Sequence, residues 1–440
     1  MINLNSYLTR ISHIKAERME GKIIEVIGFL IKAYNPGLHI GSSCLIVDPE
    51  TKESIPAEAV GFKEDCILVM PLGNIRGVGP HCRVVPSSGQ PYVSVGNALL
   101  GRTVDGMGTP IDGRGDVLGE TKRPLYSDPF NPLKRRRINQ PLDVGIKGIN
   151  GMLTVGKGQR LAILAGSGVG KSVLLGMMAR NTMADVNVIA LIGERGREVK
   201  EFIERDLGEE GLQRSVVVAA TSDHSPLVRL RGAYLATAIA QYFREEGKDV
   251  LLMMDSITRF AMAQREIGLA VGEPPTTKGY PPSVFSLLPK LLERAGNSQS
   301  KGSLTGFYTV LVEADDPNDP IGDAVRSNVD GHILLDRAIA AQGHYPAIDV
   351  LKSKSRVMVE VTSESHQENA ARLIQTLSTY KEAEDLINIG AYVKGSNSRI
   401  DYAIRKIDEI RQFLQQKIKE HFLLLECEAQ LEQIFKDYPV

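Results

Sequence analysis

The chain has 440 residues and is close to neutral, with 52 Lys and Arg against 53 Asp and Glu. It therefore has no global positive field of the kind that holds nucleic acid or an anionic membrane, and any such contact has to be local. Hydrophobic residues make up 42% and charged residues 24%, which excludes a chain that is disordered throughout. The length exceeds that of a typical domain, so two or three domains are expected.

The four cysteines are too few for a disulfide framework and include no C-x-x-C pair: Cys44, Cys66, Cys82 and Cys427. They predict buried thiols in a reducing compartment and no zinc site. No apolar run approaches the roughly 20 residues that cross a bilayer. We therefore expect a cytosolic enzyme that is neither secreted through a cleavable signal nor inserted in a membrane.

Residues 1–20 place apolar side chains at helical steps: Leu4, Tyr7, Leu8, Ile11 and Ile14. This pattern predicts a short amphipathic segment. Such a segment docks on a regulator or a membrane surface, or packs on the rest of the protein. Packing or a protein partner is favoured, and peripheral membrane association stays open.

Short β-prone runs separated by turn residues fill the zone 21–95, for example 22–27, 43–47, 65–70 and 82–85. Their spacing predicts a small β-barrel or sandwich. A glycine-dense passage follows, and then a proline-rich basic linker, 123–141, which is expected to lie over the surface. The basic residues 134–137 are interpreted as a linker charge cluster.

In the zone 96–362, apolar β-rich runs alternate with stretches of helical period such as 227–246. The runs are 161–164, 186–192, 216–220, 250–254 and 308–312. Continuous apolar strands between helices predict a parallel sheet covered on both faces. In the last zone, 363–440, Leu and Ile recur at helical steps, and the sequence Gly395 to Ser398 divides the pattern into a helical bundle.

A glycine-rich turn joins the run 161–164 to a predicted helix, 173–181. The turn reads Ala165, Gly166, Ser167, Gly168, Val169, Gly170, Lys171 and Ser172, and Val173 follows. Such glycines let successive N–H groups point into one concavity at the positive helix end, which attracts phosphate. Lys171 would supply charge to the β- and γ-phosphates, and the Ser172 hydroxyl can ligate Mg²⁺. Ala165 replaces the leading Gly of the strict phosphate-loop pattern. The alternative interpretation, a flexible glycine turn with a solvated lysine, is disfavoured.

Two carboxylates follow buried strands. Asp255 ends the run 250–254, where an acid can hold Mg²⁺ through water, although a cap or turn is the alternative. Glu194 follows the run 186–192 and would face the same crevice as Lys171, because ligands of parallel sheets bind beyond the carboxyl ends of the strands. Glu194 could orient and polarise an attacking water. The alternative for Glu194 is a helix cap or a salt bridge to a neighbouring arginine.

Taken together, these motifs resemble the rotary-type hexameric ATPases, and most closely the flagellar and injectisome type III export ATPases. They lie at 165–172, 193–197, 255–260, 278–285, 330–333 and 344–356. The likeness runs from about residue 21 to residue 414. It implies an N-terminal β-barrel, a central RecA-like ATPase domain, a C-terminal helical domain, and a ring with nucleotide at the subunit boundaries.

The resemblance also implies residue roles. Glu194 would be the catalytic carboxylate, and Lys171, Ser172 and Asp255 would serve the phosphates and Mg²⁺. Arg356 matches the arginine that such rings insert into the neighbouring subunit's site, where it stabilises the charge of the transferring phosphoryl group. Read without the family, Arg356 would be an ordinary surface charge.

Three further residues receive roles from the same resemblance. Arg195 and Arg259 would be polar partners near the γ-phosphate, and Tyr345 would pack on the adenine. From the residues alone, Tyr345 would more often be a core or rim aromatic. Asp315, in a turn before a proline, is kept as a minor candidate.

Three other classes of protein fit the sequence less well. The catalytic subunit of a rotary ATP synthase carries an acidic helix–turn–helix loop, whereas the corresponding residues 389–398 here resemble export ATPases. An RNA-dependent RecA-type helicase would need a basic and aromatic strand face, but Phe29 and Tyr34 are isolated. A pure scaffold would not need an intact phosphate site.

The sequence therefore predicts a Mg²⁺- and ATP-dependent ring ATPase of a bacterial export apparatus, at the cytoplasmic face of the membrane. A flagellar role is favoured over an injectisome role because of the run 272–280. The expected partners are further copies of the chain, regulator and stalk proteins, export chaperones and export substrates, but no specific nucleic acid.

Overall fold

The computed structural model describes residues 19–87, 91–299, 301–312, 316 and 319–438. The chain forms two compact units, one up to Tyr92 together with Ile267–Glu273, and one comprising Val93–Glu266 and Pro274–Val440. The predicted amphipathic segment, residues 1–20, lies outside the described residues except for its last two positions.

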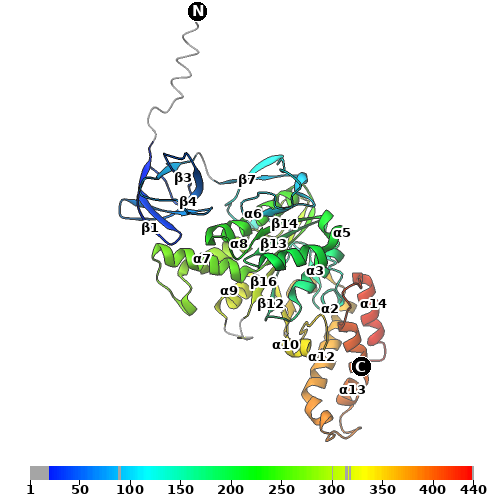
Figure 1. Ribbon diagram of the computed structural model, residues 1–440. Coiled ribbons are helices and arrows are strands. Elements are labelled where there is room, and N and C mark those ends of the chain that lie inside the picture. Colours follow the sequence, from blue (N-terminus) through cyan, green and yellow to red (C-terminus); the bar gives the residue numbers. More distant parts are fainter. Residues whose placement is uncertain (1–18, 88–90, 300, 313–315, 317–318, 439–440) are drawn as a thin grey trace, which may run out of the picture. The chain divides into compact units, whose positions relative to one another are not determined.

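The first unit contains a closed antiparallel barrel (Figure 1). Its strand order is β1-β2-β5-β4-β3-β6. Its strands are β1 Gly21–Ile27, β2 Leu30–Tyr34, β3 Ser43–Val47, β4 Ser54–Lys63, β5 Cys66–Pro71 and β6 Arg83–Pro86. Inward and outward positions alternate along β2 and β3, so that Cys44 and Ile46 fill the interior. The predicted N-terminal β-barrel is thereby confirmed.

The second unit contains an eight-stranded sheet in the order β18-β17-β12-β16-β15-β13-β14-β8. The strands are β8 Thr103–Asp105, β12 Arg160–Ala165, β13 Val186–Ile192, β14 Ser215–Ala220, β15 Asp249–Asp255, β16 Ser303–Leu311, β17 Gly331–Leu335 and β18 Lys354–Ser355. All neighbouring pairs are parallel except β17 and β18. The central strands are buried along nearly their whole length, as expected for a parallel sheet between two layers of helices.

The helices around this sheet follow the predicted alternation. They are α2 Lys147–Met152, α3 Lys171–Asn181, α4 Gly196–Glu201, α5 Gly208–Gln213, α6 Pro226–Glu245, α7 Ile257–Val271, α8 Pro282–Leu292, α9 Pro320–Asn328 and α10 Arg337–Ala341. A π-helical turn at Phe202–Leu207 joins α4 to α5. The Ser225 hydroxyl accepts from the backbone of Val228 and caps α6, where Pro226 takes the first helical position.

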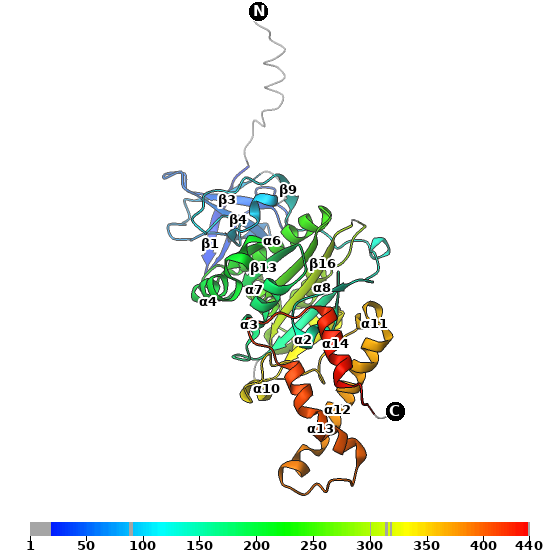
Figure 2. The same ribbon diagram turned by 90° about the vertical axis from the view of Figure 1, so that its right-hand side faces the viewer.

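The C-terminal part is helical, as predicted, with α11 Met358–Val361, α12 Glu364–Asn388, α13 Ser398–Leu414 and α14 Leu424–Ile434. Helices α12 and α13 lie side by side (Figure 2). The break between them ends where the Asn397 side chain caps α13. His366 on α12 contacts the carbonyl oxygen of Gly151 in α2 at 2.7 Å and Glu428 on α14 at 2.9 Å, so these helices are fastened to the sheet-bearing part.

Short strands complete the second unit: β7 Tyr92–Val95 pairs with β9 Thr121–Pro124, and β10 Pro141–Leu142 pairs with β11 Val155–Gly156. Among the described helices, none has both the length and the apolar character needed to cross a membrane. The four cysteines are free and buried, which confirms the prediction of buried thiols.

The basic linker is held more tightly than a simple charge cluster would be. Arg135 donates to the carbonyl oxygen of Ala295 at 2.8 Å, and Arg136 donates to those of Lys301 and Gly302, both at 2.8 Å. The interpretation of residues 134–137 as linker charges alone is therefore wrong for these two arginines. They fasten the linker to the segment that precedes β16.

Candidate active site

The glycine-rich turn after β12 leads directly into α3. Gly168 and Gly170 have φ angles of 80° and 88°, which residues with a side chain rarely adopt. Val169, between them, is buried and anchors the turn on the core. Gly170 precedes the first residue of α3 and carries no side chain that could cap the helix. The N–H groups of the first helical turn are therefore available to an anion.

The other turn residues divide into buried and exposed ones. Ala165 and Gly166 are buried at the end of β12, whereas Ser167 is exposed. Ser172 is exposed in the first turn of α3, and Val173 after it is half-buried. The Ser172 hydroxyl is thus open to a ligand above the turn.

Lys171 lies between two carboxylates at this end of the sheet. Its Nζ pairs with Oδ1 of Asp255 and lies 3.8 Å from Oε1 of Glu194. Asp255 is the last residue of β15, and Leu191 of β13 is its register partner, so both acidic side chains come from adjacent strand ends. The structure therefore brings together the lysine and the two acids named from the sequence.

Glu194 differs electrostatically from an exposed glutamate. Its side chain is only 17% exposed. Burial, a hydrogen bond shared with Glu198 and the nearby charge of Asp255 raise the pKa of Glu194 to about 8, although Lys171 opposes this. The same hydrogen bond lowers the pKa of Glu198. The contact between the two carboxyl groups therefore favours the protonated form of Glu194 and the ionised form of Glu198.

The neighbouring arginines do not neutralise Glu194. The Arg195 side chain is 82% exposed and lies 3.7 Å from Glu198, and Arg197 pairs with Glu201 at 2.7 Å. The alternative reading of Glu194 as a salt-bridge partner of these arginines thus finds no support among the described contacts.

Arg259 on α7 lies beside the turn that carries Glu194. A Cβ added to Gly193 would stand 2.9 Å from the Cβ of Arg259, so the two segments are in close contact. Gly193 also has a positive φ of 71°. Among the described residues, Nε of Arg259 is buried and has no hydrogen-bond partner.

Tyr345 lies across the start of α3. A Cβ added to Gly170 would be 3.5 Å from two carbons of the tyrosine ring. A cavity of about 1540 Å³ opens here, lined by Gly170, Val173, Tyr345, Phe413 and Gln416 among others. Gln416 donates its backbone N–H to the carbonyl oxygen of Tyr345 at 2.9 Å. The C-terminal part thus forms one wall of a cavity that begins at the glycine turn.

Sequence reasoning missed three residues around this site. Thr309 donates to Oδ1 of Asp255 at 2.7 Å, and Gln416 and Lys147 line the cavity. None of them lies in a recognisable motif, and each comes near the site only through the pairing of distant segments. The minor candidate Asp315 lies outside the described residues.

Arg356 is not near the chain's own glycine turn. It follows β18, where Ser355 pairs with Gly331 at the beginning of β17, whereas the turn follows the end of β12. Along the strands, four residues separate the level of Ser355 from the end of β12, and this distance is roughly 13 Å at about 3.3 Å per residue. The Arg356 side chain is exposed. It can serve a phosphate site only if that site belongs to another copy of the chain.

Magnesium would find suitable donors beside Lys171. Ser172 and Asp255 offer hard oxygen ligands, which Mg²⁺ prefers. The ammonium of Lys171 already pairs with Asp255, so this carboxylate position attracts a cation. The residues present therefore fit the metal that the family implies.

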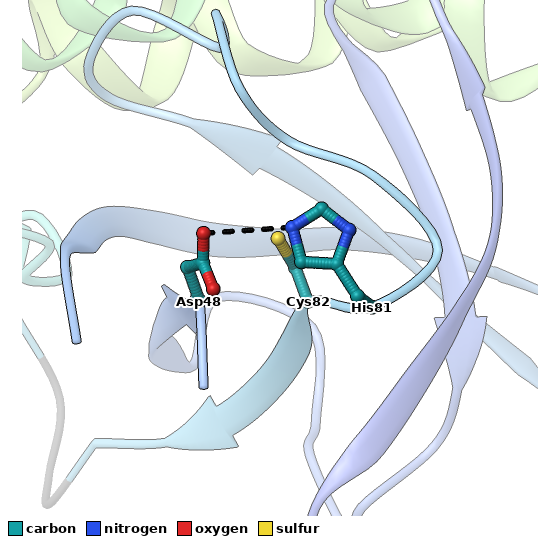
Figure 3. A group of neighbouring side chains, drawn as sticks. All are labelled: Asp48, His81 and Cys82. Carbon is teal, nitrogen blue, oxygen red and sulfur yellow. Dashed lines mark ion pairs between the residues drawn. The ribbon is translucent and has the colours of Figure 1, made fainter. Parts of the chain in front are cut away.

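A second group of ligand-type side chains lies in the barrel (Figure 3). Donor atoms of Asp48, His81 and Cys82 lie within 4.8 Å of one another, and His81 is 3.5 Å from Asp48. However, Asp48 already accepts from the backbone of Glu50 at 2.8 Å, and Cys82 is packed in the apolar barrel core. These contacts account for the arrangement, and we assign it no metal.

Comparison with known proteins gives matches over all three parts of the chain. The model of the ATP synthase alpha/beta family, nucleotide-binding domain, matches residues 145–355, and that of the β-barrel domain of the same family matches residues 23–87. Residues 362–433 match the model of the T3SS EscN ATPase C-terminal domain.

Individual relatives are similar over nearly their whole length. The flagellum-specific ATP synthase of Bacillus subtilis is 52% identical over 94% of each chain. The type 3 secretion system ATPase of Xanthomonas euvesicatoria is 51% identical over 91% of this chain and 90% of its own. The assembled ATPase EscN of the enteropathogenic E. coli type III secretion system superposes with a TM-score of 0.90 at 45% identity, covering 94% of this chain and 99% of EscN. A second structure of EscN includes its central stalk EscO.

Proposed function

Because the chain belongs to the ATP synthase alpha/beta family and, within it, to the type III export ATPases, we propose that it hydrolyses ATP at the boundaries of a ring to drive protein export. It is a P-loop ATPase with an intact glycine turn. The observation that carries the proposal is the position of Lys171, held between Asp255 and Glu194 beside that turn.

In this proposal the residues of the glycine turn bind the phosphates. The backbone N–H groups from Gly166 to Val173 and the Lys171 ammonium hold the β- and γ-phosphates, for which Lys171 leaves Asp255. Ser172 would ligate Mg²⁺ directly, and Asp255 would do so through water. When bound, Mg²⁺ would neutralise charge on the phosphate oxygens.

Glu194 is the proposed catalytic carboxylate. It orients the water that attacks the γ-phosphorus and accepts its proton, while the bond from that phosphorus to the β–γ bridging oxygen breaks and releases ADP. Arg195 follows Glu194 in the chain and Arg259 contacts the preceding Gly193, and both are proposed to contact the γ-phosphate. Tyr345 is proposed to pack on the adenine, at the mouth of the cavity.

Arg356 is proposed to act on the site of a neighbouring copy. Its separation from its own glycine turn and its exposed side chain support this role. The assembled form of EscN supports a ring, which we propose to be a hexamer, and the EscN–EscO structure supports a stalk protein as partner. Regulators, chaperones and unfolded export substrates are further proposed partners, at the inner face of the cell membrane.

For the export system we propose the flagellar one, because the run 272–280 resembles flagellar ATPases more than injectisome ones. We expect the gene to restore swimming to a strain that lacks its flagellar ATPase. It should not restore effector secretion to a strain that lacks its injectisome ATPase. Secretion restored without swimming would reverse this assignment, and a Lys171→Ala version should restore neither.

Replacing Glu194 by glutamine tests the catalytic assignment. Glutamine keeps the shape of the side chain but cannot accept a proton, so turnover should fall by about 10²–10⁴-fold, the range of general base catalysis. ATP binding should persist, as measured with a fluorescent nucleotide. Glu201→Gln is the matched control, because Glu201 is a surface partner of Arg197 on the following helix and should leave turnover unchanged.

The raised pKa of Glu194 predicts a pH dependence. Since the ionised form is required and the pKa of the free enzyme is about 8, kcat/KM should rise by about tenfold per pH unit below pH 8 and level off above it. Glu194→Gln should lose this slope. A wild-type profile that is flat across neutral pH, or a near-normal rate of the glutamine variant, would place the base elsewhere.

A further inference from the structure

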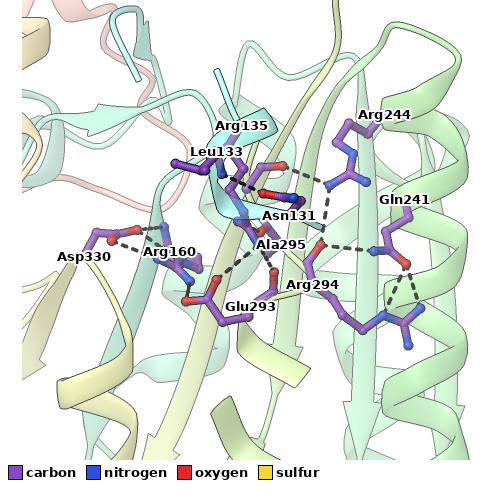
Figure 4. Close-up of polar contacts among 11 residues, drawn as sticks. Asn131, Leu133, Arg135, Arg160, Gln241, Arg244, Glu293, Arg294, Ala295 and Asp330 are labelled. Carbon is purple, nitrogen blue, oxygen red and sulfur yellow. Dashed lines mark hydrogen bonds and ion pairs between the residues drawn. The ribbon is translucent and has the colours of Figure 1, made fainter. Parts of the chain in front are cut away.

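A chain of four charged side chains connects the linker to the edge of the sheet (Figure 4). Arg135 of the linker lies 3.1 Å from Glu293, which also pairs with Arg160 at the start of β12. Arg160 in turn reaches both carboxylate oxygens of Asp330, each at 3.2 Å. Its backbone N–H donates to Asp330 Oδ2 at 3.0 Å as well.

Three of these four side chains are sheltered from water, whereas that of Glu293 is 40% exposed. The side chains of Arg135 and Arg160 are 17% and 16% exposed, and that of Asp330 is 27% exposed. Screening by solvent is weaker between Arg160 and Asp330 than on an open surface, so this pair holds its geometry more firmly than an exposed salt bridge does. Asp330 is thereby fixed by two donors of Arg160 and by its backbone.

Asp330 also holds the backbone of Arg356. Its carbonyl oxygen accepts the Arg356 N–H at 2.9 Å and a side-chain donor of Gln159 at 3.3 Å. The same Gln159 donates to the hydroxyl of Ser355 at 3.0 Å. Ser355 and Arg356 are therefore both held by hydrogen bonds at the same place in the sheet.

The residue after Arg356 is fixed too. Val357 packs on Gly156, where an added Cβ would stand 2.7 Å from the valine Cγ1. By contrast, no hydrogen bond or ion pair of the Arg356 guanidinium is found in the described part of the chain. A rigid backbone thus presents a side chain that is free to reach outward.

We propose that Asp330 is a positioning residue for Arg356, and that Arg160, Glu293 and Arg135 hold Asp330 in place. This rests on the proposed role of Arg356 in a neighbour's site. An arginine that acts across a boundary must be placed accurately, since a misplacement of about 1 Å can cost about 10²-fold in rate. Arg160 begins the strand that ends at the glycine turn, so the same network braces both halves of the composite site.

The test is Asp330→Ala in the full-length protein. We expect kcat to fall by about 10²-fold with little change in the KM for ATP, because the phosphate-binding residues are untouched. Asp323→Asn is the matched control: this carboxylate pairs with Arg326 at 3.0 Å on α9, outside the network, and its loss should change neither constant. Ring assembly is followed by light scattering. If the alanine variant does not assemble, Asp330→Asn, which keeps an acceptor, is used in the same assays.

Subunit mixing distinguishes positioning from general structural support. Asp330→Ala subunits should regain activity when they are mixed with Lys171→Ala subunits, which supply an intact Arg356. They should not regain it when they are mixed with Arg356→Ala subunits. Rescue by both or by neither, or full activity of the unmixed variant, would overturn the positioning role. If Arg356→Ala and Lys171→Ala also fail to rescue each other, the proposal that two copies share the site is wrong. If they do rescue each other, only the positioning role of Asp330 is refuted.

Discussion

Replacing Lys171 by alanine should abolish ATP turnover while leaving the chain folded. The ammonium is the one charge of the glycine turn that can reach the β- and γ-phosphates, and its removal also leaves Asp255 facing Glu194 without the cation between them. Loss of transition-state stabilisation of about 10³-fold or more is expected for a group of this kind.

Phosphate release measures the effect, and circular dichroism checks the fold. Lys157→Ala is the matched control: Lys157 pairs with Asp249 at the opposite end of the same strand, β15, so this variant also removes a lysine–aspartate pair. It should retain turnover. Near-normal hydrolysis by Lys171→Ala would refute the phosphate-site assignment.

Replacing Arg356 by alanine should lower turnover by about 10³–10⁵-fold, the contribution of an arginine that stabilises charge on the transferring phosphoryl group. The fold should be unaffected, because the backbone of Arg356 is held by Asp330 and its side chain is exposed. ATP binding by single subunits should also persist, because Arg356 does not reach the chain's own glycine turn.

The matched control is Lys354→Ala, which removes an exposed positive charge from β18, the short strand that ends just before Arg356. It should reduce turnover far less than Arg356→Ala does. Equal losses of turnover in the two variants would mean that positive charge at this edge of the sheet matters in general, and that the Arg356 guanidinium has no specific role.

The sequence predicted much of this site because its signals are local. Lys171 and Glu194 come shortly after buried strands, Asp255 ends one, and parallel strands bring their carboxyl ends to one edge. The glycines of the turn indicate by themselves the backbone conformation that the turn requires. The β-barrel and the C-terminal helical part could likewise be predicted, because their hydrophobic periodicity is visible within short stretches of the sequence.

Contacts between distant segments could not be predicted in this way. Arg160 and Asp330 are 170 positions apart. Arg135 pairs with Glu293 and also donates to the backbone carbonyl of Ala295, a group that every residue carries and no sequence pattern marks. The wall that Gln416 adds to the cavity depends on where the C-terminal part packs. Burial of a charge depends on such packing, so the sequence alone indicates no more than a charge cluster for the linker arginines.

The central claim is that one active site is built from two copies of the chain, and mixing Lys171→Ala with Arg356→Ala subunits tests it most directly. Each variant alone should be inactive. In a random one-to-one mixture about a quarter of the boundaries pair an intact glycine turn with an intact arginine, so up to about that share of wild-type turnover should return. No recovery at any mixing ratio, with both variants assembling normally, would contradict the account.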